Sequence, residues 1–385
     1  MSCNNLIKRL CLAQPEERSS SDDGENEGED EDDKDKDVIK VLLDQLFDIK
    51  YVNNNNHAMA NFSCPQLDMI IPQLPINIFT WDFDPINMII SSHMLCCVFM
   101  HVIDESNLLS FFSISRENLS KFSFQVAKMY YNSSNPYHNI LHAIHVFHSM
   151  HMLLKIKDVQ EKVKKYPMLL FASYIAALCH DLDHCGSTNR FLVATKNKKA
   201  IQYNGIYPQE MHHAYVTLQL LEENNIIEGS KLAKSELVFK EHIVKIIMAT
   251  NIAVHNTVIE QFDITNPLMC IQLCLKCADM SHTFSYLESH LKWVNMLQNE
   301  FFIQGDREKM LGLALNPLFN RDVRNILFAT QSHFFSIIVI PMFELLFQTF
   351  PSTANTPIAE NIKKNNRHWS RRKHLAKLEV STPKN

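Results

Sequence analysis

The stretch YHNILHAIHVFHSMH, residues 137–151, carries five histidines in a run that is otherwise largely apolar. Its apolar residues recur at helical spacing, so the stretch predicts a helix. His138 and His142 are four residues apart and are expected to share one helix face and point into one pocket. The later histidines turn progressively away from that face, and these are His145, His148 and His151. Because a lone histidine on an apolar face is more often a core residue than a ligand, a functional interpretation needs partners elsewhere in the chain.

Outside this stretch, the composition also favours helices. The chain has 385 residues, is 46% apolar and contains 7 glycines, so it can bury a large core with few of the turn signals of a β-sandwich. Helical periodicity is clear in RENLSKFSFQVAKMYY (residues 116–131) and in NRDVRNILFATQSHFFSIIVIPMFELLFQTF (residues 320–350). We expect one large, compact, multi-helix domain of the all-α class.

The charge is distributed unevenly and divides the chain. Residues 16–37 hold thirteen acidic and three basic residues, a net charge of −10, whereas the whole chain carries −5. Such a block buries too little apolar surface to offset its conformational entropy, so we expect disorder there. Residues 38–49 predict a short amphipathic helix. The expected organisation is an acidic, largely disordered extension over 1–75, a helical domain over 76–352, and a basic C-terminal helix or tail over 353–385 that partly packs on the domain.

The composition argues against several classes of protein. By subtraction, the chain outside residues 16–37 carries +5 without a long lysine and arginine stripe, which suits a small anionic ligand better than nucleic acid. The ten cysteines lack the spacing of a secreted disulfide framework, and CLKC (residues 274–277) lies in an apolar run that predicts core packing. The most apolar segments, 94–103 and 334–347, fall short of the roughly 20 residues of a membrane span. We therefore expect a cytoplasmic protein without a transmembrane segment.

Two further stretches supply partners for the histidines. His180 and Asp181 end an apolar run in ALCHDLDHCGSTN, and Asp279 interrupts another apolar run in LCLKCADMSH. Ionisable side chains in such positions are costly unless they are paired or bound to metal. With His142 they make two imidazoles and two carboxylates from three helices, a set that suits zinc as well as magnesium or manganese. The pattern is the one expected for a dinuclear hydrolytic site.

These motifs, in this order, resemble the catalytic domain of the class I 3′,5′-cyclic-nucleotide phosphodiesterases, a branch of the HD-type metal phosphohydrolases. NPYHNILHA matches YHNxxHA, HDLDHCGSTNRF matches HDxDHxGxxNxF, and CADMSH stands at the metal aspartate of the family. QEMHHAYV, FFIQGDREKMLGL and TQSHFFSIIVIPMF match further family motifs. The resemblance covers about residues 81–369, and NPYHN and His282 bring it nearest to the calmodulin-stimulated subfamily.

The resemblance implies a set of metal ligands. It makes four residues the ligands of a tight ion, expected to be Zn²⁺, and these are His142, His180, Asp181 and Asp279. Asp181 is expected to bridge to a second, water-rich ion, Mg²⁺ or Mn²⁺. Three outer residues are expected to hold the waters of that ion, and these are His184, Glu210 and Thr250.

The resemblance also implies a reaction. Two cations lower the pKa of a shared water from 15.7 to about 7 and clamp the phosphate oxygens, so that hydroxide attacks phosphorus in line. His138, outside the metal set, is expected to protonate the departing O3′ as general acid. The expected activity is hydrolysis of cAMP, cGMP or both to the nucleoside 5′-monophosphate, which ends cyclic-nucleotide signalling.

A nucleotide pocket is implied in the same way. Gln331 is expected to bind the purine edge, with Phe334 and Leu297 on the two faces of the ring. Tyr137 and His282 are expected to line the same cavity. A glutamine amide both donates and accepts, so it suits adenine in one orientation and guanine in the other. The preferred purine therefore does not follow from the sequence.

Three positions depart from the family pattern by replacing an acid, and these are His145, Asn251 and Asn320. None belongs to the predicted metal set, so they put the second-ion water network and the full rate in doubt rather than the reaction. They leave open a weakened, nucleotide-binding scaffold. A third alternative is another HD-type phosphohydrolase, against which Gln331 and FFIQGDREK argue.

The sequence also leaves two partners open. NNLIKRLCL (residues 4–12) has a basic, apolar character that is compatible with a contact to a regulatory partner such as calmodulin, or to a membrane. A homodimer is open as well.

Overall fold

The structure is a computed structural model that describes residues 78–88, 91–323 and 326–381. The chain divides into two compact units, residues 1–61 and 62–385, and all described residues belong to the second unit. The predictions for residues 1–75, among them the acidic extension, the helix at 38–49 and the contact at NNLIKRLCL, lie outside the described residues.

Every regular element in the described part of the chain is a helix, which confirms the all-α class. After a short 3₁₀ helix (Pro85–Asn87), the first eight α-helices of this part are α4 (Ser92–Glu105), α5 (Leu108–Phe112), α6 (Arg116–Tyr131), α7 (Ile140–Leu154), α8 (Lys157–Val163), α9 (Pro167–Cys179), α10 (Asn189–Ala194) and α11 (Lys198–Gln202). The later helices are α12 (Pro208–Glu223), α13 (Glu236–Met248), α14 (His255–Glu260), α15 (Pro267–Asp279), α16 (Leu287–Met310), α17 (Ile326–Phe334), α18 (Ile340–Thr349) and α19 (Pro357–Ser381). The helix predicted over residues 116–131 coincides with α6.

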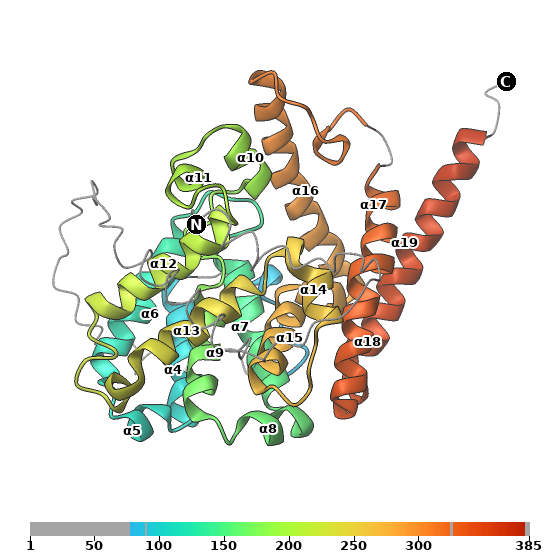
Figure 1. Cartoon of the computed structure of the whole chain (residues 1–385). Helices are drawn as coiled ribbons and strands as arrows, with labels where there is room; N and C mark the ends of the chain where they lie inside the picture. The colour runs from blue at the N-terminus through green and yellow to red at the C-terminus, as the bar shows by residue number, and fades with distance from the viewer. Residues whose placement is uncertain (1–77, 89–90, 324–325, 382–385) are drawn as a thin grey trace, which may run out of the picture. The chain divides into compact units, whose positions relative to one another are not determined.

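Three helices position the candidate site (Figure 1). α7 packs against both α9 and α15, and α9 also packs against α13. Nearly every residue of α7 and α9 is buried. A proline in the first turn of α9 and of α15 sets where each helix begins. Each runs for 13 residues, so His180 directly follows α9, and Asp279 is the last residue of α15.

The helix predicted in the histidine-rich stretch begins later than expected. Asn139 caps α7, and its Oδ1 accepts the backbone N–H of Leu141 at 2.9 Å. His138 therefore lies before the helix, and the prediction that it shares a helix face with His142 is wrong. The two imidazole rings are nevertheless neighbours, with centroids 5.6 Å apart. The turn before α7, rather than the helical period, brings them together.

A long apolar helix crosses the second predicted stretch. α17, a five-residue π-helical turn (Phe335–Val339) and α18 follow one another without a break. Over Leu327–Thr349 they form a helix of 23 residues that is long and apolar enough to span a membrane. The expectation that this segment is too short is therefore wrong. Length and apolar composition alone are weak evidence for a membrane span, because the core helix of a soluble protein meets the same criteria. In this helix Phe335, Met342 and Leu346 are buried within the unit.

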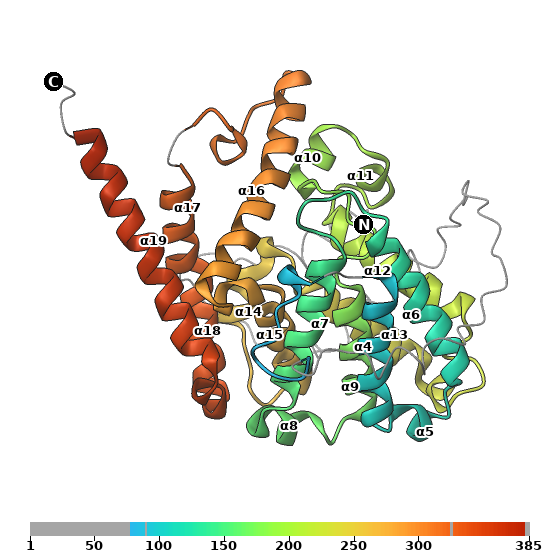
Figure 2. The ribbon, with the colours of Figure 1, turned by 180° about the vertical axis from the view of Figure 1, so that it is seen from behind.

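Two smaller predictions concern packing. Cys274 and Cys277 of the CxxC sequence are buried free thiols in α15, which confirms core packing. The basic stretch near the C-terminus belongs to α19, which lies along α17, as Figure 2 shows from behind. Most of its lysine and arginine side chains are exposed, whereas Asn361, Asn365 and Trp369 are buried. α19 is thus a docked helix with a solvated basic face.

Candidate functional site

Four side chains meet where α7, α9 and α15 come together. The Nε2 atoms of His142 and His180 lie 3.2 Å apart. Asp181 Oδ2 lies 3.3 Å from the first of these nitrogens and 3.2 Å from the second. Asp279 Oδ1 lies 3.2 Å and 3.5 Å from the same two atoms. Ligands at about 2.1 Å around one tetrahedral ion are spaced by about 3.4 Å, so this donor set fits a shared divalent cation.

Hydrogen bonds from outside the cluster hold His180 and Asp181 in place. Nδ1 of His180 donates to the carbonyl of Ala177 at 3.1 Å, which directs Nε2 to the cluster. The backbone N–H of Asp181 donates to the hydroxyl of Tyr130 at 3.1 Å. Outer contacts of this kind fix the orientation of ligands at metal sites. His180 and Asp181 are therefore each held by a partner outside the four-residue cluster.

The electrostatics of the cluster favour positive charge. Burial opposes the charged form of His180, but the carboxylates of Asp181 and Asp279 outweigh it and raise the pKa of His180 to about 10. Burial likewise opposes ionisation of Asp279, but hydrogen bonds from His142 and His180 outweigh it and hold the pKa of the carboxyl well below its usual range. Two half-buried carboxylates beside two buried imidazoles can therefore stabilise a bound cation.

His138 lies beside the cluster. Its Nε2 is 3.9 Å from Asp181 Oδ2, and its Nδ1 is hydrogen-bonded to Oε1 of Glu300. Oε2 of Glu300 accepts the backbone N–H groups of Tyr137 and His138 at 3.0 and 3.1 Å. Burial would lower the pKa of His138, but Glu300 and Asp181 outweigh it and raise this pKa to about 9. His138 is therefore held protonated, with one N–H bound to Glu300 and the other facing the cluster.

A second group surrounds the other oxygen of Asp181. The ring of His184 lies 3.9 Å from that of His138 and 5.7 Å from that of His213. Nε2 of His213 is 3.7 Å from Asp181 Oδ1. Asp181, His184 and His213 each offer a donor atom within 4.8 Å of the others. This side of Asp181 is thus also lined by groups that can face a cation or its waters.

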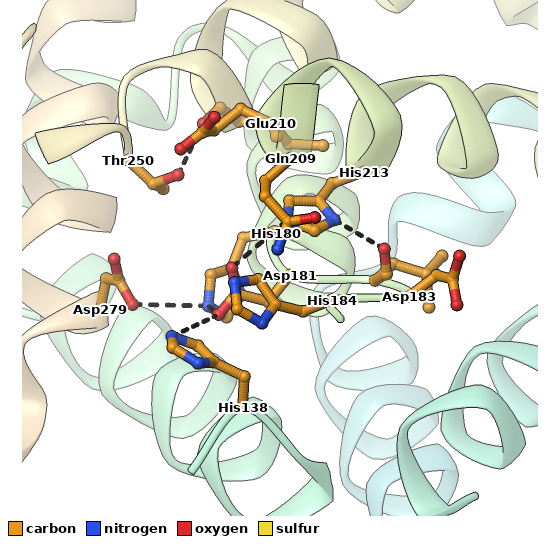
Figure 3. A network of polar contacts seen from close by, with 12 residues as sticks. His138, His180, Asp181, Asp183, His184, Gln209, Glu210, His213, Thr250 and Asp279 are labelled. Carbon is orange, nitrogen blue, oxygen red and sulfur yellow. Dashed lines mark hydrogen bonds and ion pairs between the residues drawn. The ribbon is translucent and has the colours of Figure 1, made fainter. Parts of the chain in front are cut away.

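Glu210 and Thr250, both predicted as outer residues, face one another in Figure 3. Oε2 of Glu210 accepts from Asn189 at 2.7 Å, and burial raises the pKa of the Glu210 carboxyl. The Thr250 hydroxyl donates to the carbonyl of Ile247 at 2.8 Å. Glu210 lies in α12 and Thr250 in the turn that follows α13, and these two helices pack together.

The predicted pocket residues are placed in part. Tyr137 is buried, and its ring lies 4.7 Å from that of His142 and 6.1 Å from that of His282. Gln331 is buried on α17, and its Oε1 has no hydrogen-bond partner in the described part of the chain. Such an orphaned acceptor fits a residue that binds a ligand. Leu297 and Phe334 are half-buried on α16 and α17, and no described contact joins them to the other three.

A family profile described as 3′5′-cyclic nucleotide phosphodiesterase matches residues 137–361, more than half of the chain. The chain belongs to this family. The match contains all thirteen predicted site residues, from Tyr137 to Phe334. The phosphodiesterase family is also the one that the sequence motifs resemble.

Named relatives and solved structures agree with the phosphodiesterase assignment. The chain is 32% identical over 272 residues, 68% of its length, to the human high affinity cGMP-specific 3′,5′-cyclic phosphodiesterase 9A. It is 33% identical over 280 residues, 69% of its length, to the mouse dual specificity calcium/calmodulin-dependent 3′,5′-cyclic nucleotide phosphodiesterase 1C. It spans 45% and 39% of these two proteins, less than half of each. The phosphodiesterase domain of the Salpingoeca rosetta rhodopsin phosphodiesterase superposes with a TM-score of 0.71 at 26% identity, over 80% of this chain and 96% of that one.

Sequence reasoning missed three residues of this candidate site. Glu300 holds His138, His213 faces Asp181, and Asn135 links the loops of His138 and His184 through their carbonyls. Of these, Glu300 could have been found from the sequence, because it is an acidic residue in the middle of a helix and precedes two phenylalanines. The paired histidines of QEMHHAYV match a family motif, but the sequence assigns no role to His213.

Proposed function

We propose that this chain hydrolyses the 3′ ester bond of a 3′,5′-cyclic nucleotide and releases the nucleoside 5′-monophosphate. The observation that carries the proposal is the convergence of His142, His180, Asp181 and Asp279 on one point. Family membership supports the reaction class. The activity and substrate remain a proposal for this chain because it spans less than half of its named relatives.

The donor chemistry supports two divalent ions. Two imidazoles and two carboxylates suit Zn²⁺ as the tight ion. The second oxygen of Asp181, with His184, Glu210 and Thr250 as outer residues, suits Mg²⁺ or Mn²⁺. Bound divalent ions supply a water of lowered pKa and offset the negative charge of the phosphate. The protein residues orient the ions and the substrate around that chemistry.

His138 is proposed as the general acid. Ribose O3′ is a poor leaving group unless it is protonated, and a proton donor must lie near the phosphate. The Nε2–H of His138 faces Asp181, and Glu300 stabilises the protonated ring. As the proton leaves Nε2, the Glu300 contact keeps the ring in the same orientation, ready to be reprotonated.

The pocket is proposed to bind the purine. Gln331 contributes a buried carboxamide with an unpaired oxygen, and Tyr137 and His282 present adjacent rings beside His142. Leu297 and Phe334 are proposed to close over the ring faces, with a contribution of roughly 1–3 kcal/mol from aromatic stacking. One relative is named as cGMP-specific and the other as dual specificity, so both cyclic nucleotides are substrates to test.

The residues that depart from the family pattern have structural contacts away from the four ligands. His145 is buried and stacks on Trp293, with ring centroids 5.2 Å apart. Oδ1 of Asn251 accepts the N–H of Ala253 at 2.8 Å. Oδ1 of Asn320 accepts the N–H of Asp322 at 3.2 Å. None of these three contacts involves a cluster residue, so the substitutions leave all four proposed metal ligands in place.

The proposal is tested by a substrate panel with defined metal content. Zinc-loaded protein is incubated with cAMP, cGMP, deoxynucleotide triphosphates and a phosphomonoester, each with Mg²⁺ or Mn²⁺. We expect 5′-AMP, 5′-GMP or both as the only products. Tight binding of a cyclic nucleotide without product would favour the scaffold, and turnover of the non-cyclic substrates alone would favour another HD-type phosphohydrolase.

The remaining predictions concern regulation, assembly and location. A calmodulin contact at residues 4–12, a homodimer and a cytoplasmic location stay predictions. The name of the calcium/calmodulin-dependent relative supports the calmodulin contact. Pull-down of the full chain on calmodulin with and without Ca²⁺ tests it.

A further inference from the structure

Trp369 on α19 is buried against a residue of α16. Its indole Nε1–H donates to Nε2 of His290 at 2.8 Å, and their exposed fractions are 2% and 0%. The neighbouring segment Ser281–Phe284, a 3₁₀ turn that follows Asp279, also contacts α19. This turn carries His282 of the candidate pocket. The C-terminal helix therefore reaches the pocket through buried polar contacts.

The indole contact determines where His290 carries its proton. An indole N–H can only donate, so Nε2 of His290 is an acceptor. Burial lowers the pKa of His290 to about 4, so the ring is neutral at pH 7 and its single proton lies on Nδ1. This Nδ1–H donates to the backbone carbonyl of His282 at 2.9 Å. The tautomer of His290 thus follows from its partners on both sides.

The tautomer of His282 follows in turn. Its ring stacks on that of His290, with centroids 5.3 Å apart and planes at 6°, and the two Nδ1 atoms are 3.3 Å apart. Two N–H groups facing one another at this distance would repel, so Nδ1 of His282 is an acceptor. Burial holds the pKa of His282 well below its usual value, so the neutral ring carries its proton on Nε2. No hydrogen bond to this Nε2 occurs among the described residues.

We propose that Trp369 is a positioning residue for the pocket: acting through His290, it holds His282 as the tautomer whose Nε2–H is free to donate to an acceptor atom of the bound nucleotide. The nature of the ligand rests on the proposed function, whereas the chain of hydrogen bonds does not. Once the indole N–H is removed, only the carbonyl of His282 still favours the proton on Nδ1 of His290, so the preference for this tautomer is weaker. The Nε2–H tautomer of His282 is then held less firmly.

The kinetic test uses Trp369→Phe in the zinc-loaded full chain, because phenylalanine keeps an aromatic ring but has no N–H. We expect the KM for the cyclic nucleotide to rise about fivefold with kcat within about twofold, the effect of one lost neutral hydrogen bond in binding. The matched control is Asn361→Leu on the same helix, which removes a 2.9 Å bond to the carbonyl of Phe284 but leaves the indole contact. An equal rise in KM in both variants would show that Trp369 acts only by docking α19, and the inference would be wrong.

A double-mutant cycle places the effect on His282. His282→Phe removes the donor itself, so Trp369→Phe should add less than about twofold to the KM of that variant. Independent, multiplicative effects would contradict a path through His282.

A spectroscopic test does not depend on turnover. In ¹⁵N-histidine-labelled wild-type protein, the imidazole shifts should show His290 protonated on Nδ1 and His282 on Nε2, and Trp369→Phe should mix the tautomers of both rings. Protonation of wild-type His282 on Nδ1 would overturn the inference even if Trp369→Phe does not fold. Should wild-type protein turn over neither cyclic nucleotide, the proposed function fails, and the tautomers still decide this inference.

Discussion

Glu300 lies 162 residues beyond His138 in the sequence, yet its carboxylate binds the His138 ring and the two backbone N–H groups of Tyr137 and His138. One side chain of α16 thereby fixes both the loop and the ring of the proposed proton donor. It also stabilises the protonated ring, whose pKa is raised to about 9. We therefore expect Glu300 to act on the proposed proton donor, an effect that can be separated from metal binding.

Glu300→Gln should lower kcat by about 10- to 100-fold, because the amide removes the charge that keeps His138 protonated and oriented. Zinc content should remain at the wild-type level. The matched control is Glu308→Gln on the same helix, a buried glutamate that binds Gln304 and the backbone of Asn316 instead. Steady-state kinetics and metal analysis check both variants. Equal losses of kcat in the two variants would show that the loss does not depend on the contact between Glu300 and His138.

Removing a cluster carboxylate should act through the metal. Asp279→Ala should lose the tight ion and lower turnover by more than about 100-fold, beyond what loss of an outer contact usually costs. His138→Ala should lower turnover with near-normal zinc content, since His138 lies outside the four donors. Elemental analysis of purified variants, together with turnover at saturating Mg²⁺, separates the two. Zinc loss in His138→Ala would contradict its assignment as proton donor.

The loop of His138 should depend on a glycine in the neighbouring loop. Nδ2 of Asn135 donates to the carbonyls of His138 and His184 at 3.1 and 2.8 Å. Gly186 has a φ of +65°, and a Cβ there would lie 2.5 Å from Oδ1 of Asn135. Gly186→Ala should therefore displace Asn135, lower kcat, and lower the free energy of unfolding by more than the roughly 1–2 kcal/mol that a left-handed alanine costs.

Gly229→Ala is the matched control for this backbone cost. Gly229 has a φ of +74° with no atom within 4 Å of an added Cβ. Urea unfolding should show a loss of about 1–2 kcal/mol, and kcat should not change. A Gly186 variant that resembles the Gly229 variant in both measurements would mean that the Asn135 contact does not matter.

Acid should destabilise the fold through the buried histidines of α7. Burial lowers the pKa of His151 to about 4, with Lys155 adding to the effect. The folded state keeps this ring neutral, whereas the unfolded chain binds a proton below about pH 6.5. The free energy of unfolding is therefore unaffected by His151 above that pH. It falls as the pH drops from 6.5 towards 4, by up to about 3 kcal/mol for this one group.

His151→Gln should lose less stability over the same pH range, because glutamine does not titrate and can still pair with the hydroxyl of Tyr174, 3.2 Å from Nδ1 of His151. Urea unfolding at pH 7.5 and at pH 4.5 gives the two free energies for each protein. Parallel losses in wild type and variant would assign the acid sensitivity to other groups.

The candidate cluster illustrates what can be predicted without coordinates. His142, His180, Asp181 and Asp279 stand in short motifs at the ends or in the middle of apolar runs, where an unpaired ionisable group is costly. The structure brings all four together. Periodicity also located α6. It failed at His138, where the cap at Asn139 starts α7 late. The apolar run 334–347 also underestimated the length of its helix, because α17, the π-helical turn and α18 join over Leu327–Thr349.

By itself, the sequence determined the helical class, the family resemblance and the residue types of the cluster, because these depend on composition, short-range spacing and motif order. Only the tertiary structure decided which distant groups complete the site. Glu300 beside His138, and Trp369 behind His290 and His282, are partners joined across some 80 to 160 residues. Their pairing depends on how packed helices bring buried donors and acceptors together, and local sequence periodicity carries no record of that geometry.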